Sequence, residues 1–354
     1  MKKIVSLTFA DPRVQGGIEG FNRALKKFYP EEFVMITYSN NCEKIYDVSD
    51  VIEIGSRNIF FRIINKIFKN KIREFLIKKN IKKSGSNIII LAHPNDLKLL
   101  KDSKMIKILV QHSSYEAYLK DFCHGKEEYK NLIKSEADYF VTLSKYDAMR
   151  FQKGLELDKK KIRVIRHSTS LEILNDKKLK NKKLIMIGRI DNSSKRYDLA
   201  IKAMKKLQDY TLDIYGVAHK QSDLDYLKNI ILTEKIDNVS FKGVTNKVQE
   251  KLDESGIFIM TSDYEGYPIS TIEAMRRGLP IVLRNTFDSA RDIVIDNGIL
   301  LEKEWSEDKF VEAIRKVYNN YEYYSENSKK LGERHSLRVI KKEWDKLFTE
   351  IGEE

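Results

Sequence analysis

Two glutamates in one segment of the chain are the residues with the clearest chemical potential. Glu265 and Glu273 have seven residues between them, and their segment lies between the apolar runs 256–261 and 279–283. Pro268 suits the first turn of a helix, because its missing N–H would have no partner there, and a glycine follows the helical pattern. We therefore predict a strand, a loop that carries Glu265, and a helix that carries Glu273.

The start of this predicted helix suits an anion. The amides of Ile269, Ser270 and Thr271 would have no acceptor within the helix, and the helix dipole favours negative charge there. Of the two glutamates, one carboxylate suits the hydroxyls of a sugar and the other suits a ribose diol. A ligand with both hydroxyls and phosphate fits this segment.

Two carboxylates beside a diphosphate would repel it, so positive charge must come from another segment. Arg189 and Lys195 directly follow the apolar run 184–188, which we predict to be the first strand of the same sheet. A guanidinium and an ammonium group at the carboxyl edge of that sheet can neutralise a leaving diphosphate.

The elements that must position these residues are strands and helices in alternation, which is typical of βαβ units and parallel sheets. The predicted strands of the first part are 3–9, 33–38, 87–92, 106–111, 139–143 and 162–165. Those of the second part are 184–188, 211–216, 239–243, 256–261 and 279–283. From residue 307 onward the apolar spacing is helical only. The predicted fold class is α/β, with two doubly wound Rossmann-like domains that face each other across a cleft.

The expected domains follow from this alternation. We place an N-terminal Rossmann-like domain at 1–170, a charged linker at 171–183, and a second Rossmann-like domain at 184–335. The remaining residues, 336–354, are expected to form a C-terminal helix that packs back toward the first domain. A length of 354 residues agrees with two hydrophobic cores.

Composition limits the class of partner. Lys and Arg total 65 against 52 Asp and Glu, and the net charge of +13 favours a polyanionic partner. Cys42 and Cys123 are too far apart in the sequence to indicate a disulfide framework, so we expect a reducing, cytoplasmic compartment. The sequence has no uncharged apolar run of about 18 residues, so we expect any membrane contact to be peripheral, on the inner face of the plasma membrane.

The motif residues resemble a known family. Glu265 and Glu273 are similar to the E-x7-E motif of family-4 retaining glycosyltransferases, which have the GT-B fold, and Gly188-Arg189 with Lys195 is similar to that family's phosphate-binding residues. The resemblance extends to Gly16-Gly17, Gly216 and Gly243, similar to glycines near the donor, to His112, similar to the active-site histidine, and to Ser144.

The resemblance implies a retaining hexosyl- or N-acetylhexosaminyltransferase that needs no metal and no cofactor. It also implies that the domain at 1–170 binds the acceptor and that the domain at 184–335 binds the nucleotide sugar. The co-substrate would be a nucleotide-diphosphate sugar, with UDP favoured by its frequency in cell-surface polysaccharide enzymes, and the acceptor a cell-surface glycan or a lipid-linked glycan. The implied catalytic residues are Glu265, His112, Arg189 and Lys195. The implied donor-binding residues are Gly16, Gly17, Gly188, Gly216, Gly243, Tyr267, Pro268, Ile269, Ser270, Thr271 and Glu273.

Two positions depart from the family pattern. Arg196 stands where the family usually has glycine after the phosphate-binding lysine, and Arg166-His167-Ser168 replaces the usual Asn-Gly. These departures concern the shape of two loops and the donor specificity.

A basic segment at 57–83 contributes much of the net positive charge. It has apolar residues at helical spacing, so one interpretation is a core helix with a basic outer face. The other is a surface that docks on anionic lipid headgroups and gives access to the acceptor. The residues assigned to acceptor or membrane contact are Arg62, Lys66, Lys69 and Arg73.

Simpler interpretations remain for several residues. Two glutamates eight positions apart are common on solvated helices. Gly16-Gly17 can form a tight turn, and His112 can be a core or loop histidine. The alternative functions are a nucleotide-sugar 2-epimerase-like enzyme and a catalytically silent partner subunit of the same fold. A nucleic-acid partner is not expected, because no zinc finger, RNP-like motif or single-strand stacking platform is present.

Overall fold

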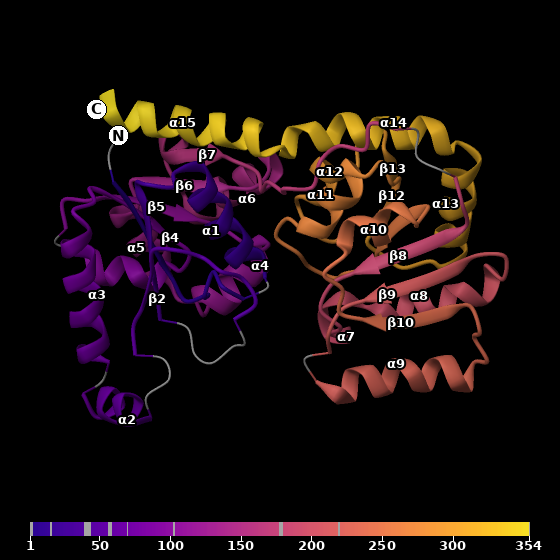
Figure 1. Cartoon of the computed structure of the whole chain (residues 1–354), viewed down its shortest axis with the longest axis horizontal. Helices are drawn as coiled ribbons and strands as arrows, with labels where there is room; N and C mark the ends of the chain where they lie inside the picture. The colour runs from indigo at the N-terminus through magenta and orange to yellow at the C-terminus, as the bar shows by residue number, and fades with distance from the viewer. Residues whose placement is uncertain are drawn as a thin grey trace. The chain divides into compact units, whose positions relative to one another are not determined.

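The computed structural model describes residues 3–14, 16–38, 44–55, 59–68, 70–101, 103–176, 180–218 and 220–353, apart from the side chains of Ile59 and Arg62. The chain divides into two compact units, Met1–His167 with Lys341–Glu354, and Ser168–Ile340. Each unit is a parallel sheet with helices (Figure 1). The predicted α/β class, with two Rossmann-like sheets, is confirmed.

Unit 1, the one that begins at Met1, contains a seven-stranded parallel sheet in the order β3-β2-β1-β4-β5-β6-β7. Its strands are β1 Ile4–Thr8, β2 Phe33–Thr37, β3 Val51–Glu53, β4 Ile88–Leu91, β5 Ile106–Val110, β6 Tyr139–Thr142 and β7 Ile162–Val164. Its helices are α1 Gly17–Phe28, α2 Ile59–Ile67, α3 Lys71–Ser84, α4 Tyr115–Ala117, α5 Glu127–Glu136 and α6 Lys145–Leu155, with the last part of α15 Leu337–Glu353.

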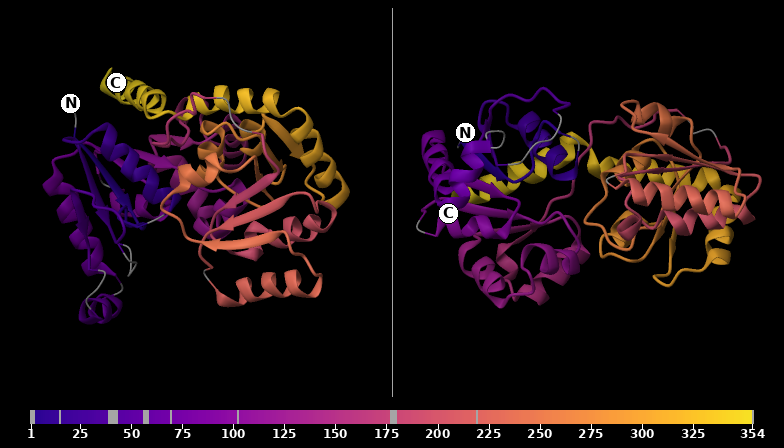
Figure 2. Two further views of the ribbon diagram at one scale, coloured as in Figure 1. Left: turned by 45° about the vertical axis from the view of Figure 1, so that its right-hand side comes forward. Right: turned by 90° about the horizontal axis from the view of Figure 1, so that it is seen from below.

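Unit 2 contains a six-stranded parallel sheet in the order β10-β9-β8-β11-β12-β13. Its strands are β8 Lys183–Ile187, β9 Thr211–Tyr215, β10 Val239–Gly243, β11 Ile257–Met260, β12 Ile281–Arg284 and β13 Gly298–Leu301. Its helices are α7 Asn192–Lys195, α8 Tyr197–Ala203, α9 Gln221–Thr233, α10 Val248–Asp253, α11 Ile269–Arg276, α12 Ala290–Ile293, α13 Glu307–Asn319 and α14 Tyr321–Gly332. Figure 1 and the left view of Figure 2 place α9 beside the edge formed by β10.

Central strands are buried on both faces because helices cover the sheets, which is why these strands appear in the sequence as continuous apolar runs. Every residue of β1, β4 and β6 is buried in unit 1, and every residue of β11 and β12 in unit 2. The two edge strands β3 and β13 were not predicted. All their residues are only partly buried, although both strands consist mainly of apolar residues.

The C-terminal helix α15 packs within unit 1 through its last part. Trp344 is almost completely buried and its ring lies 5.9 Å from that of Phe21. The next residue, Asp345, accepts a hydrogen bond of 2.9 Å from the Tyr29 hydroxyl. Aromatic contacts and this hydrogen bond therefore fix this part of the helix.

The segment expected as a linker is hydrogen-bonded to α11 of unit 2. The Leu174 amide donates to the Arg276 carbonyl at 2.9 Å, and the Arg277 guanidinium donates to the Glu172 carbonyl at 2.8 Å. Thus residues 171–174 lie on the surface of unit 2, and the division between the units falls between His167 and Ser168. No helix of the described ranges has the length and apolar character required to cross a membrane.

Candidate active site

Three glycine turns lie side by side at the carboxyl edge of the unit 2 sheet. The Gly188 amide donates to the Tyr215 carbonyl, and the Gly216 amide donates to the Gly243 carbonyl, so the ends of β8, β9 and β10 are hydrogen-bonded to one another. The register of β10 against β9 shifts between Phe241 and Gly243. Gly216 has a φ of +152°, and a Cβ there would lie 1.8 Å from the Gly188 carbonyl oxygen. Only glycine fits at this position, and the sheet edge stays clear of side chains.

Lys195 and Glu265, predicted from separate segments, are brought into contact. The Lys195 ammonium group forms an ion pair with the Glu265 carboxylate, and Ser262 donates a hydrogen bond of 2.8 Å to the same oxygen. Both side chains of the pair are mostly buried. Because β11 is the neighbour of β8 in the sheet, the loops that follow these strands meet at one edge.

Arg189 lies at the same edge, directly after β8. Its guanidinium is half exposed and lies 3.5 Å from the Asp191 carboxylate. Asp191 also caps α7, accepting hydrogen bonds from the amide and hydroxyl of Ser193. Arg189 therefore keeps most of its donors directed to solvent, where they can reach an anion.

Helix α11 begins where the sequence predicts, but one of its three predicted donors is occupied. The Thr271 amide donates to the Pro268 carbonyl at 3.2 Å, so the expectation that it faces an anion is wrong. The tight turn forms because the Thr271 hydroxyl also donates to that carbonyl, at 2.6 Å. The amides of Ile269 and Ser270 have no acceptor in the part of the chain that the structure describes.

Glu273 lies inside α11, in an environment that disfavours its charge. Burial raises the pKa of this carboxyl group to about 7, and no hydrogen bond or ion pair from the described residues offsets this. The residue keeps part of its surface exposed, so a ligand can reach it, and donors from a ligand would stabilise the ionised carboxylate. The two glutamates of the motif thus differ, since Glu265 is paired with a cation and Glu273 is not.

The side chain of Tyr267 does not face the sheet edge. It is buried, and its hydroxyl lies 3.2 Å from both the Asp292 carboxylate and the His335 ring. The hydroxyl is thus directed into unit 2, where these contacts hold the loop that carries Glu265. The assignment of Tyr267 to donor binding stays a prediction.

Arg196 occupies a left-handed turn, with a φ of 49° and a ψ of 48°. This conformation costs an ordinary residue about 1 kcal/mol relative to glycine. It explains why glycine is usual here in the family that the sequence resembles. The turn ends α7 immediately after Lys195 and begins α8.

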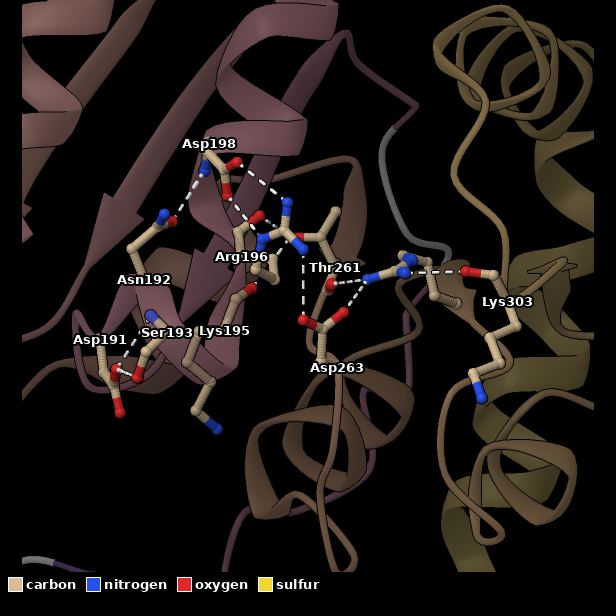
Figure 3. Close-up of polar contacts among 10 residues, drawn as sticks. Asp191, Asn192, Ser193, Lys195, Arg196, Asp198, Thr261, Asp263 and Lys303 are labelled. Carbon is tan, nitrogen blue, oxygen red and sulfur yellow. Dashed lines mark hydrogen bonds and ion pairs between the residues drawn. The ribbon is translucent and has the colours of Figure 1, made fainter.

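Side chains that the sequence did not single out hold this turn (Figure 3). Arg196 donates to Asp198 at 3.1 Å and to Asp263 at 3.2 Å, and Asp263 accepts a further bond of 2.6 Å from Arg284. The Thr261 hydroxyl donates to the Arg196 carbonyl at 2.8 Å. Figure 3 shows the Lys195 side chain extending away from this cluster, so the network positions the backbone of Lys195 and leaves its amine for the site.

One signal in the sequence could have revealed this cluster. Arg284 ends the buried strand β12, and a charged residue with so little exposure requires a partner. Asp263, which follows β11, is the carboxylate at the neighbouring strand end.

In unit 1, His112 follows β5 at the carboxyl edge of the sheet. Its ring nitrogens are buried and have no hydrogen-bond partner in the described residues. The ring stacks on that of His167 at 5.5 Å, and Phe21 contacts it edge-on at 4.9 Å. Burial, and secondly the neighbouring His167, holds the pKa of His112 well below its usual value, so the ring is neutral at pH 7.

The glycine pair of unit 1 lies at the start of α1. Gly17 is the first residue of the helix, and a Cβ added to Gly16 would lie 2.1 Å from a carboxylate oxygen of Glu19. Gly16 thus permits the Glu19 carboxylate to fold over the helix start. Ser144 has a local role, because its hydroxyl accepts from the Asp147 amide at 3.0 Å and caps α6.

The residues assigned to acceptor or membrane contact lie in or between α2 and α3. Lys66 and Arg73 line a small cavity there. Lys69 and the side chain of Arg62 lie outside the described residues. The segment forms two helices. The second, α3, buries Ile77 and Ile81 in the core of unit 1, as the interpretation of a core helix with a basic outer face expects, whereas most apolar side chains of α2 are exposed.

The fold is that of GT-B glycosyltransferases. HepE of Anabaena, solved in complex with UDP and glucose, superposes with a TM-score of 0.79 over 99% of this chain and 100% of that chain, at 14% identity. The two parallel Rossmann-like sheets of the chain are therefore those of a known enzyme architecture.

Residues 172–335 match the family described as glycosyl transferases group 1, slightly less than half of the 354-residue chain. An uncharacterized glycosyltransferase of Haemophilus influenzae is 27% identical over 338 residues, 88% of this chain and 94% of the relative. The O-antigen biosynthesis glycosyltransferase WbnH of Escherichia coli is 26% identical over 265 residues, 72% of this chain and 74% of the relative. These findings support a group 1 glycosyltransferase and favour neither alternative function.

The left-handed turn at Arg196 leads to a stability prediction. Arg196→Gly and Arg196→Ala both remove the guanidinium, but only glycine relieves the backbone. We expect Arg196→Gly to be more stable to urea than Arg196→Ala by about 1 kcal/mol. If the alanine variant were equally stable or more stable, the turn would not be left-handed in solution.

Proposed function

We propose that the chain is a retaining glycosyltransferase that moves a hexosyl or N-acetylhexosaminyl group from a nucleotide-diphosphate sugar, with UDP as the nucleotide, to a cell-surface glycan or a lipid-linked acceptor. The observation that carries the proposal is the contact between Lys195 and Glu265 at the glycine-lined sheet edge, within the segment that matches the group 1 family. The proposed location is cytoplasmic, with unit 1 at the inner face of the plasma membrane.

The diphosphate of the donor is assigned to the edge formed by β8 and the start of α11. Arg189 and Lys195 supply positive charge, and the amides of Ile269 and Ser270 supply directed donors. Gly188, Gly216 and Gly243 allow the nucleotide to approach the strand ends closely. Lys195 would exchange part of its contact with Glu265 for the phosphate, which leaves Glu265 able to accept from a sugar hydroxyl.

The ribose is assigned to Glu273. Its carboxylate lacks a partner among the described residues, and two ribose hydroxyls can donate to the two oxygens. This interaction favours the ionised form and therefore opposes the effect of burial on the pKa. In unit 1, we assign contact with the transferred sugar to the neutral ring of His112, whose nitrogens have no partner in the described residues.

In the proposed reaction, the acceptor hydroxyl attacks the anomeric carbon from the face that the diphosphate leaves. The bond from carbon to the phosphate oxygen breaks, the new glycosidic bond forms, and the hydroxyl proton passes to the departing phosphate. Arg189, Lys195 and the amides of α11 stabilise the charge on the leaving group, so we infer that transfer needs no metal.

The proposed function is tested first by a thermal-shift screen of UDP, GDP, ADP and CMP with their sugar conjugates, in EDTA. We expect UDP and one UDP-sugar to raise the melting temperature selectively. Preference for another nucleotide would overturn the choice of UDP, and stabilisation by none would overturn the transferase assignment itself.

The leaving-group role of Lys195 has a kinetic consequence. Lys195→Ala should lower kcat about a hundredfold, because the lost charge acts chiefly in the transition state. Lys205→Ala is the matched control, since this exposed lysine pairs with Glu234 at 3.2 Å away from the proposed site. Initial rates with a UDP-sugar in EDTA measure both, and an unchanged kcat for Lys195→Ala would remove the residue from the mechanism.

The raised pKa of Glu273 predicts how donor affinity depends on pH. The ionised carboxylate accepts the ribose hydroxyls, and it becomes protonated as the pH falls through about 7. We therefore expect the Kd of a UDP-sugar to rise about tenfold between pH 8 and pH 6. A UDP-sugar is the correct probe, because its diphosphate diester does not titrate in this range, whereas UDP does.

Calorimetric titration of the same UDP-sugar with Glu273→Gln provides the control. This variant should bind more weakly at pH 8 and lose the pH dependence. A wild-type Kd that is flat from pH 6 to pH 8 would contradict the ribose assignment.

A further inference from the structure

Helix α2 exposes an apolar face in unit 1. Ile63, Ile64 and Ile67 recur at intervals of three and four residues, so they share one face of the helix. They are 53%, 44% and 68% exposed, and the adjoining Phe68 is 54% exposed. A cluster of large apolar side chains on a short helix marks an interaction surface rather than a stable solvent-exposed face.

The opposite side of α2 fixes the helix to unit 1. Asn65 is buried, its side-chain amide donates to Asn70 at 2.8 Å, and its side-chain oxygen accepts from the Arg73 amide at 3.0 Å. Phe61 packs against the core of the unit. Since these contacts set the rotation of the helix, the exposure of Ile63 and Ile67 follows from specific hydrogen bonds. Figure 1 and the left view of Figure 2 place α2 beyond the first turn of α3, away from the sheet.

The neighbouring helix α3 exposes positive charge. Lys71, Lys78 and Lys82 lie on one helical face, and Phe75, which is 65% exposed, lies among them. Within the described ranges, these lysines form no ion pair. An anionic bilayer has negatively charged headgroups over a hydrocarbon interior. Lysines around an exposed aromatic ring fit such a surface, because the lysines can contact the headgroups while the ring enters the apolar layer.

A small cavity lies between the two helices and the end of β2. It has a volume of about 150 Å3, and its polar lining is formed by Tyr38, Asn65, Lys66, Asn70 and Arg73. The Arg73 guanidinium lies 5.4 Å from the centre of the Tyr38 ring. Two cations and amide donors around a cavity of this size suit a single phosphoryl group.

We propose that α2 and α3 dock unit 1 on an anionic phospholipid membrane. The apolar face of α2 enters the headgroup layer, the lysines of α3 lie against lipid phosphates, and the cavity beside Arg73 takes one phosphoryl headgroup. Docking through these residues requires neither binding of the nucleotide sugar nor transfer of the sugar. It would bring the proposed transferase close to a lipid-linked acceptor.

The first experiment is flotation of the full chain with vesicles of phosphatidylcholine alone or with phosphatidylglycerol. We expect binding only to the mixed vesicles, and loss of most binding when salt is raised from about 0.05 M to about 0.5 M, because charge attraction is screened. Equal binding to both vesicle types, or none to either, would overturn the proposal.

Two double variants test whether the apolar residues of α2 contribute to membrane binding by their position, or only as exposed apolar area. Ile63→Ser with Ile67→Ser should lower partition into the mixed vesicles about tenfold. The control is Met149→Ser with Leu232→Ser, which removes residues that are 67% and 77% exposed on other helices. An equal loss in both pairs would contradict docking through α2.

The contribution of the α3 lysines to vesicle binding is tested with a second set of variants. Lys78→Gln with Lys82→Gln should lower partition about tenfold. Lys228→Gln with Lys330→Gln removes the same charge from exposed positions in unit 2 and should have little effect. Arg73→Gln should weaken binding to phosphatidylglycerol vesicles, and unchanged binding would exclude the cavity from the docking site.

Two further measurements separate membrane docking from donor binding and from self-association. The melting shift caused by UDP should be the same in the α2 variant and the wild type, so a failed donor assignment and a failed docking assignment remain distinguishable. If size-exclusion chromatography showed a dimer that Ile63→Ser with Ile67→Ser converts to a monomer, the face would be a contact between copies and not a membrane surface.

Discussion

The position of Lys195 depends on a carboxylate shared by two arginines. Asp263, which follows β11, accepts hydrogen bonds from Arg196 and Arg284, and its amide donates to the Ser194 carbonyl at 2.8 Å. These contacts join the turn after β8 to the ends of β11 and β12. They hold Arg196 in a left-handed conformation that would otherwise be unfavourable. The remaining features of the site in unit 2 are built around this fixed turn.

At the carboxyl edge of the unit 2 sheet, most charged side chains are paired, and a few remain for a ligand. Asp263 is neutralised by arginines, and Glu265 by Lys195. Glu273 has no such partner within the described residues and carries a raised pKa. The Arg189 guanidinium has only a long contact with Asp191 among the residues that the structure describes. A ligand with a diphosphate and a diol would complement these two unbalanced groups, which is the physical basis of the proposed donor.

In unit 1, the candidate site residue His112 and the exposed apolar face of α2 belong to different segments. His112 is held among rings at the carboxyl edge of the sheet, where burial keeps it neutral. The apolar face of α2 belongs to a different segment, positioned by Asn65 and Asn70. The first arrangement suits contact with a neutral sugar, and the second suits a surface that attracts an apolar layer. The proposed membrane-docked transferase would use both.

The sequence by itself determined the two parallel sheets, because buried parallel strands require continuous apolar runs between helical segments. It also placed Glu265, Arg189 and Lys195 at strand ends, since residues that follow neighbouring parallel strands reach one edge. The edge strands β3 and β13 were not predicted, and their length of three and four residues gives a shorter pattern than that of most central strands. Only the tertiary structure decided which groups are paired: Lys195 with Glu265, Asp263 between two arginines, Tyr267 turned inward, and α2 turned outward. Such pairings depend on side-chain directions and on strands far apart in the chain, which local sequence patterns do not encode.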